Sequence, residues 1–165
     1  MRREAAFAFA LEADGGGPLL SGFVDALARE PDGGVLVVDY KSDRLGDEDP
    51  ATLAERDYGT QRQVYALAAL RDGAPSVEVA HCFLERPAEA AVARYTRADA
   101  PALAAALLDL AAGVLAERWP VTSRPHRELC AECPGRASLC SWPESVTLRP
   151  YEDSAGTLAG SGGPS

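Results

Sequence analysis

Residues 19–42 constrain the fold of this chain more than any other segment. They contain two runs typical of β-strands, residues 19–30 and 34–42, and the second run is rich in valine. Between the runs stands Pro31-Asp32-Gly33, in which proline presets the first turn position and glycine takes the left-handed one. The sequence therefore predicts a hairpin with a three-residue loop, in which Glu30 pairs with Gly34.

This register brings two carboxylates together at the end of a strand. Counting outwards from the loop, Asp25 lies opposite Asp39. The strand that carries Asp39 is apolar on both faces, which indicates a buried central strand. Two carboxylates in such a place repel each other unless a cation neutralises them. Because the ligands are oxygens, Mg²⁺ or Mn²⁺ fits better than zinc.

The alternation of side chains along a strand places Lys41 on the same face as Asp39. An ammonium beside a metal-bound carboxylate can orient or activate a water and can offset charge on a phosphodiester. The alternative is a surface hairpin in which the aspartate and the lysine form an exposed ion pair of little consequence.

Three motifs, in this order, resemble those of RecB-type nucleases in the PD-(D/E)xK superfamily. The first two are the Gly-Phe-Val-Asp of residues 22–25 and the Val-Val-Asp-Tyr-Lys of residues 37–41. The third lies in residues 58–65, where Gln61 and Tyr65 resemble the family's Q-x-x-x-Y signature. Since Gln61 and Tyr65 are four residues apart, they share one face of a helix.

The resemblance implies a role for each residue of these motifs. Asp25 and Asp39 would ligate the metal, Tyr40 would add its backbone carbonyl, and Lys41 would serve the nucleophilic water. Gln61 and Tyr65 would reach the site or the DNA backbone. The implied fold is α/β, a restriction-endonuclease-like mixed β-sheet flanked by helices.

Three cysteines, Cys130, Cys133 and Cys140, lie within eleven residues, whereas Cys82 is distant. The group resembles the C-terminal cysteine triplet of the iron–sulfur members of the same family, which implies a [4Fe–4S] cluster with its fourth cysteine upstream. His126 stands four residues before Cys130, so a Zn²⁺ site of three cysteines and one histidine is the competing prediction. A third possibility leaves the thiols unliganded.

The remaining pattern predicts the elements around this centre. Asp49-Pro50 is typical of a helix start, and Asp72-Gly73 of a helix end, with room for a break near Gly59. Further strands are expected at residues 7–11, 76–86 and 90–95, and a second helix from Asp99 to about Trp119. We expect a nuclease core over residues 1–149, with the cysteine cluster at 120–143, and a disordered tail over residues 150–165.

The expected function is metal-dependent, exonuclease-type hydrolysis of DNA, within a helicase–nuclease system of repair or recombination. The chain lacks the acidic or histidine residue that family members carry on a helix well upstream, and Glu4 is a conceivable substitute. It therefore resembles the C-terminal part of a larger protein or a reduced descendant. The alternative is a catalytically incomplete DNA-binding or scaffold domain of the same fold.

The composition bears on partners and location. A net charge of −9 argues against a free-standing basic clamp for nucleic acid, since phosphate contacts need lysine and arginine. We therefore expect a helicase domain or subunit to supply much of the DNA grip. With neither a signal peptide nor an apolar run near membrane-spanning length, a cytoplasmic protein without a membrane contact is expected.

Overall fold

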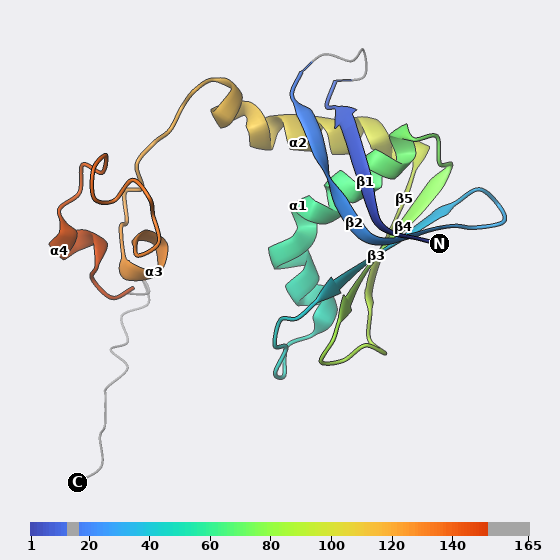
Figure 1. Ribbon diagram of the computed structural model, residues 1–165, viewed down its shortest axis with the longest axis horizontal. Coiled ribbons are helices and arrows are strands. Elements are labelled where there is room, and N and C mark those ends of the chain that lie inside the picture. The colour runs from blue at the N-terminus through green and yellow to red at the C-terminus, as the bar shows by residue number, and fades with distance from the viewer. Residues whose placement is uncertain (13–16, 152–165) are drawn as a thin grey trace, which may run out of the picture. The chain divides into compact units, whose positions relative to one another are not determined.

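The computed structural model describes residues 1–12 and 17–151 (Figure 1). Most of the expected tail, residues 152–165, lies outside the described residues. The chain forms two compact units, Met1–Glu117 and Arg118–Ser165.

The first unit is a five-stranded mixed sheet with flanking helices, as the sequence predicts. The strands lie in the order β1-β2-β3-β4-β5, with β3 and β4 parallel and the other neighbours antiparallel. A parallel pair needs a crossover connection, which here is helix α1 between β3 and β4. The elements are β1 (Arg2–Ala10), β2 (Leu19–Arg29), β3 (Val35–Lys41), α1 (Pro50–Arg71), β4 (Ser76–Phe83), β5 (Ala91–Thr96), the 3-10 helix η1 (Arg97–Asp99) and α2 (Ala100–Leu115).

The hairpin between β2 and β3 has the predicted register. The amide of Glu30 donates to the carbonyl of Gly34 at 2.8 Å, and the ladder continues as far as Ala26 opposite Val38. Gly33 has φ +88°, the left-handed conformation that glycine adopts at little cost. The turn chemistry therefore fixes which residues face each other at the far end of the hairpin.

Helix α1 begins where the sequence predicts. The side chain of Asp49 accepts a hydrogen bond from the amide of Thr52 at 2.9 Å, and Pro50 occupies the first helical position. The expected break near Gly59 does not occur, because the helix runs unbroken through this residue to Arg71. One glycine lowers helix propensity by only about 1 kcal/mol, which the packing of α1 on the sheet offsets.

Three other boundaries differ from the prediction by more than one residue. β1 begins at Arg2 rather than at residue 7. β4 ends at Phe83 rather than at residue 86, because a turn follows in which the amide of Arg86 donates to the carbonyl of Phe83. Helix α2 ends at Leu115, short of Trp119. β4 is followed by Leu-Glu-Arg and α2 by Ala-Glu-Arg, which permit either structure, so pattern alone does not place these two ends.

Helix α2 also corrects the expectation that no stretch reaches membrane-spanning length. The helical stretch Arg97–Leu115 is long and apolar enough to cross a membrane, by length and composition only. Its Leu103 and Leu107 are buried in the main core cluster with residues of α1, which is the arrangement of a helix that packs on a neighbour. Leu110 and Val114 remain exposed.

His81 is the polar residue buried most deeply in the first unit. Its side chain on β4 is 0% exposed, and neither ring nitrogen has a hydrogen-bond partner among the described residues. Burial lowers the pKa of His81, because it penalises the charged imidazolium. The charge of Asp39 opposes this shift, while the charges of Lys41 and Arg62 reinforce it. His81 is therefore neutral in the folded protein near pH 7.

The second unit holds two short helices, α3 (Arg127–Cys130) and α4 (Glu144–Thr147). A hydrogen bond joins two segments in its described part: the amide of Arg127 donates to the carbonyl of Arg149 at 2.8 Å. The guanidinium of Arg149 in turn donates to the carbonyl of Pro125 at 2.9 Å. These polar contacts, rather than a large apolar core, organise the described part of this unit.

The buried histidine makes stability depend on pH. The unfolded chain takes up a proton at His81 near pH 6.5, whereas the folded chain resists it, so the free energy of unfolding falls as the pH drops below about 6.5. The loss is expected to reach at most about 1.4 kcal/mol per pH unit. His81→Leu should remove this part of the slope in urea unfolding between about pH 7 and about pH 5. His126→Leu is the matched control and should retain it. If the free energy of unfolding depended equally on pH in His81→Leu and in the parent protein, the effect could not be assigned to His81.

Candidate active site

A buried carboxylate at the end of β3 is the centre of the site. Val35, Val37 and Asp39 alternate onto the buried face of the strand, and Asp39 is only 4% exposed. A buried charge needs compensation. Asp39 receives it from two sides: the hydroxyl of Tyr65 donates to Oδ1 at 3.1 Å, and Nζ of Lys41 lies 2.7 Å from Oδ2.

Gln61 closes these contacts into a ring. Lys41 Nζ donates to Gln61 Oε1 at 2.7 Å, and Gln61 Nε2 donates to the hydroxyl oxygen of Tyr65 at 2.8 Å. Because an ammonium has only donors, the amide oxygen of Gln61 must face Lys41, which turns its NH₂ group toward Tyr65. Asp39, Lys41, Gln61 and Tyr65 thus form a closed ring, called here the four-residue ring.

Tyr65 acts in this ring as a hydrogen-bond donor to Asp39. Burial raises the pKa of Tyr65 most, and the charge and hydrogen bond of Asp39 raise it further, as does the charge of Asp25. The hydrogen bond from Gln61 works in the opposite direction. The phenol therefore keeps its proton throughout the neutral range and remains able to donate to Asp39.

Asp25 adds the second carboxylate from β2. The main-chain ladder between β2 and β3 extends to Ala26 and Val38, and one further step of this register would bring Asp25 opposite Asp39. There the carboxylate of Asp25 accepts the backbone amide of Tyr40 at 2.8 Å. Asp25 is exposed, whereas Asp39 is buried. The pair thus offers one solvated and one desolvated carboxylate at the same end of the hairpin.

Glu4 lies on the other side of Asp25. The pairing of Arg3 with Ala26 and of Ala5 with Val24 leaves Glu4 opposite Asp25 on β1. Its backbone has φ 45°, in the left-handed region, which costs a non-glycine residue of the order of 1 kcal/mol. The backbone of β1 is therefore locally irregular beside Asp25, and the side chain of Glu4 is exposed there.

The oxygens present suit a hard divalent cation. Oδ2 of Asp39 is buried and makes no hydrogen bond, so its charge is met by the ion pair with Lys41 alone. Within the described residues no group of three or more carboxylates, histidines and cysteines could hold a metal. The protein would thus offer the carboxylates of Asp25 and Asp39 and the carbonyl of Tyr40. Mg²⁺ accepts such a set, because it commonly keeps several waters.

The sequence prediction missed a second layer around the ring. The ring of Tyr58 lies 3.7 Å from Lys41 Nζ, measured to its centroid, and its hydroxyl donates to Asp43 at 2.7 Å. Tyr58 also packs against His81, with ring centroids 5.5 Å apart. A signal was available, since Tyr58 precedes Gln61 by three residues and so lies on the same helix face.

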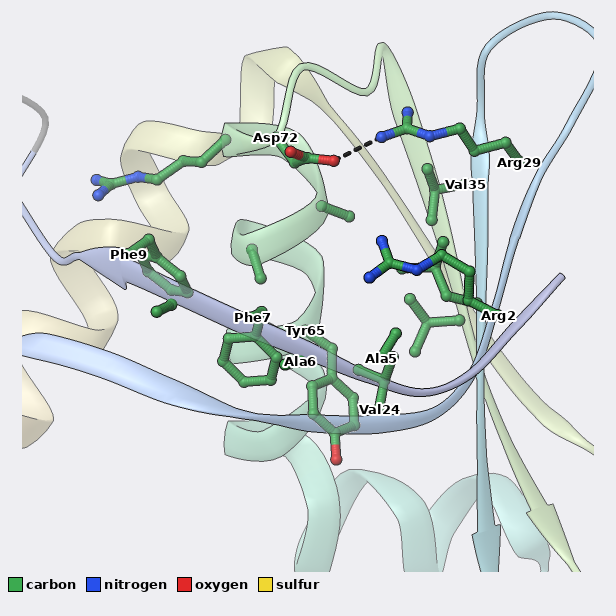
Figure 2. A pocket seen from close by; sticks show the side chains of 16 residues that line it. Arg2, Ala5, Ala6, Phe7, Phe9, Val24, Arg29, Val35, Tyr65 and Asp72 are labelled. Carbon is green, nitrogen blue, oxygen red and sulfur yellow. Dashed lines mark hydrogen bonds and ion pairs between the residues drawn. The ribbon is translucent and has the colours of Figure 1, made fainter.

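A cavity of about 290 Å³ borders the site without belonging to it. Its lining comes from β1, β2, β3 and the second half of α1, with Phe7 and Phe9 among its apolar side chains and Arg2 near the Arg29–Asp72 ion pair (Figure 2). Of the four-residue ring only Tyr65 reaches it, and Figure 2 shows the hydroxyl of Tyr65 pointing away from the arginines. Asp25, Asp39 and Lys41 do not line it, so this cavity is not the centre of the chemistry.

The cysteine residues are not gathered in the same way. Cys130 is buried, Cys140 is half-buried and Cys133 is exposed, and all are free thiols. In the described part of the chain they form no metal-holding group, with or without His126. His126 instead packs on the ring of Tyr151, with centroids 4.6 Å apart. The described arrangement does not bring these side chains to a common point, so a metal at the cysteines rests on the sequence pattern alone.

Comparison with known proteins identifies the family of the chain. A family model described as "PD-(D/E)XK nuclease superfamily" matches residues 2–140. A solved structure entitled "Crystal structure of SSO0001" is similar with a TM-score of 0.48 at 17% sequence identity, covering 82% of this chain and 61% of that chain. The chain thus spans less than two thirds of that protein's length. No curated protein matches the sequence.

The four-residue ring should be visible in stability measurements. Lys41→Met removes the cation beside a buried carboxylate and should lower the free energy of unfolding by about 3–5 kcal/mol. The loss should be seen in urea unfolding without added divalent metal. Adding Asp39→Asn to this variant removes the uncompensated charge, so the double variant should recover part of the loss. A double variant less stable than Lys41→Met alone would contradict the charge compensation.

Proposed function

Because the chain belongs to the PD-(D/E)XK nuclease superfamily, we propose that it hydrolyses phosphodiester bonds of DNA with Mg²⁺ or Mn²⁺ held by Asp25 and Asp39. The observation that carries the proposal is the four-residue ring, in which an ammonium lies 2.7 Å from the buried carboxylate of Asp39. Asp25, the second carboxylate, accepts the backbone amide of the next residue, Tyr40, at 2.8 Å. Members of this superfamily are metal-dependent nucleases, so the family and the side-chain chemistry point to the same reaction.

Each residue of the site has a proposed task. Asp25 and Asp39 bind the cation, and the carbonyl of Tyr40 is a third ligand. When bound, the metal would lower the pKa of a coordinated water and polarise a phosphate oxygen. Lys41 orients the attacking water and offsets negative charge on the phosphate as it is attacked. Gln61 and Tyr65 hold Lys41 and Asp39 in place.

The choice of lysine supports a chemical role. The chain has fifteen arginines and one lysine, and that lysine is Lys41. Arginine is a planar, permanently charged fork, whereas lysine carries a compact ammonium whose three N–H groups can turn toward a water or a phosphate. A chain so biased toward arginine nevertheless has lysine at the one place where a compact ammonium meets a buried carboxylate.

The finer assignment rests on the motif resemblance. We propose exonuclease-type digestion within a helicase–nuclease system of DNA repair or recombination, because residues 22–25, 37–41 and 61–65 resemble RecB-type motifs in this order. The net charge of −9 favours a partner domain or subunit that supplies positive charge for the DNA.

The alternative is a catalytically incomplete, DNA-binding or scaffold domain of the same fold. The observation that favours it is that the described residues contain no group of three metal-binding side chains. A domain of this kind would keep the fold and the four-residue ring but would not turn over DNA.

A cleavage assay separates the two proposals. Linear single- and double-stranded DNA should be degraded with Mg²⁺ or Mn²⁺ and remain intact with a chelator. Asp39→Asn and Lys41→Ala should each lower the rate by about a hundredfold or more, since the first removes a charged metal ligand and the second removes the ammonium that offsets charge on the phosphate. Asp109→Asn removes an exposed carboxylate on α2 and is the matched control. No cleavage by the unaltered protein, despite metal binding, would favour the incomplete domain.

A structural metal at the cysteines is a separate proposal, supported by the sequence alone. Three thiols within eleven residues, after the last long helix, are typical of a [4Fe–4S] or Zn²⁺ site that orders a polar segment. Elemental analysis and a visible spectrum of anaerobically purified protein should find iron or zinc, and Cys133→Ser should lower both metal content and thermal stability. Zinc without iron would favour His126 as the fourth ligand. Neither metal in the unaltered protein would end the proposal.

A further inference from the structure

The ammonium of Lys41 has a third neighbour besides the two within the four-residue ring. Nζ lies 3.7 Å from the centroid of the Tyr58 ring, well inside the range of about 6 Å over which an aromatic face attracts a cation. The Lys41 side chain is only 11% exposed, so water screens this attraction weakly. Tyr58 comes from the same face of α1 as Gln61, and both side chains approach Lys41 from the helix.

Tyr58 is itself held on two sides. Its hydroxyl donates to Asp43 Oδ2 at 2.7 Å, which ties the helix to the loop that follows β3. Its ring packs against His81 and Phe83 of β4, with centroids 5.5 Å and 6.4 Å away. Burial and the hydrogen bond to Asp43 raise the pKa of Tyr58 to about 12. The phenol therefore stays neutral and keeps donating to Asp43.

An ammonium has three N–H groups and no acceptor. Asp39 Oδ2 and Gln61 Oε1 each lie 2.7 Å from Lys41 Nζ, and the Tyr58 ring covers another side of the nitrogen. A third carboxylate at this place would add negative charge where an anionic phosphate has to approach. The aromatic face attracts the ammonium and brings no net charge.

We propose that Tyr58 is a positioning residue, whose aromatic ring holds the Lys41 ammonium beside Asp39. The inference deepens the proposed nuclease function and depends on it for its kinetic consequence. The position of the Lys41 ammonium, on which the inference depends, can be measured without DNA cleavage.

The test uses the fact that Lys41 is the only lysine of the chain. The side-chain ammonium of a ¹⁵N-labelled protein gives a ¹H–¹⁵N correlation in water only where the group is held and its protons exchange slowly. Here any such lysine signal belongs to Lys41. Reductive methylation, followed by mass spectrometry at one fixed pH, gives a second readout with the N-terminal amine as internal reference.

Three variants distinguish the effect of the Tyr58 aromatic ring on the Lys41 ammonium from other effects. Tyr58→Leu removes the aromatic face, and Tyr58→Phe keeps the face but loses the hydrogen bond to Asp43. Tyr95→Leu is the control, because Tyr95 on β5 also contacts α1, through a hydrogen bond from Arg62 at 2.9 Å, but does not touch Lys41. All are compared with the unaltered full chain.

We expect the Lys41 signal in the unaltered protein, in Tyr58→Phe and in Tyr95→Leu, and its loss in Tyr58→Leu. The methylation rate of Lys41 should rise about tenfold in Tyr58→Leu only. With DNA, the same variant should lose about tenfold in kcat with little change in KM, and Tyr58→Phe should restore the rate.

Three results would overturn the proposal. They are the absence of a held ammonium in the unaltered protein, an unchanged signal and methylation rate in Tyr58→Leu, and a Tyr58→Phe variant that behaves like Tyr58→Leu. If the unaltered protein does not cleave DNA, the proposed function fails, while the signal and the methylation rates still decide whether Tyr58 holds Lys41.

Discussion

The structure of this site depends on the cost of burying one carboxylate. Asp39 is 4% exposed at the end of a central strand, where an unpaired charge would strongly destabilise the fold. Lys41 and Tyr65 each satisfy one of its oxygens, and Gln61 joins these two partners. Since the four side chains come only from β3 and α1, the crossover that makes the parallel pair of strands also assembles the site.

This constraint explains why the surrounding elements are where they are. The hairpin loop sets the register of β2 and β3 as far as Ala26 opposite Val38, and beyond it Asp25 accepts the backbone amide of Tyr40. Helix α1 must remain unbroken from Asp49 onward, because Tyr58, Gln61 and Tyr65 have to lie on one face. The result is a site with one solvated and one buried carboxylate and an ammonium held on several sides, a combination suited to a hard cation and a phosphodiester.

The sequence predicts the part of this arrangement that rests on local rules. Pro31-Asp32-Gly33 defines a turn, the turn defines the register, and the spacing of four between Gln61 and Tyr65 defines a helix face. The sequence does not predict what depends on tertiary packing. The continuity of α1 through Gly59, the burial of His81 and the approach of Tyr58 to Lys41 all arise where the helix meets the sheet. The sequence also does not predict the hydrogen bonds that close the four-residue ring, because they depend on side-chain rotamers.

In the proposed site Asp25 and Asp39 together would hold a divalent metal beside Lys41. The most direct measurement is a crystal structure of the protein soaked in Mn²⁺, with anomalous diffraction recorded near the manganese edge. We predict one strong anomalous peak within about 2.5 Å of oxygens from both carboxylates. A peak bound elsewhere, or no peak at this site under conditions in which the protein is folded, would contradict the account.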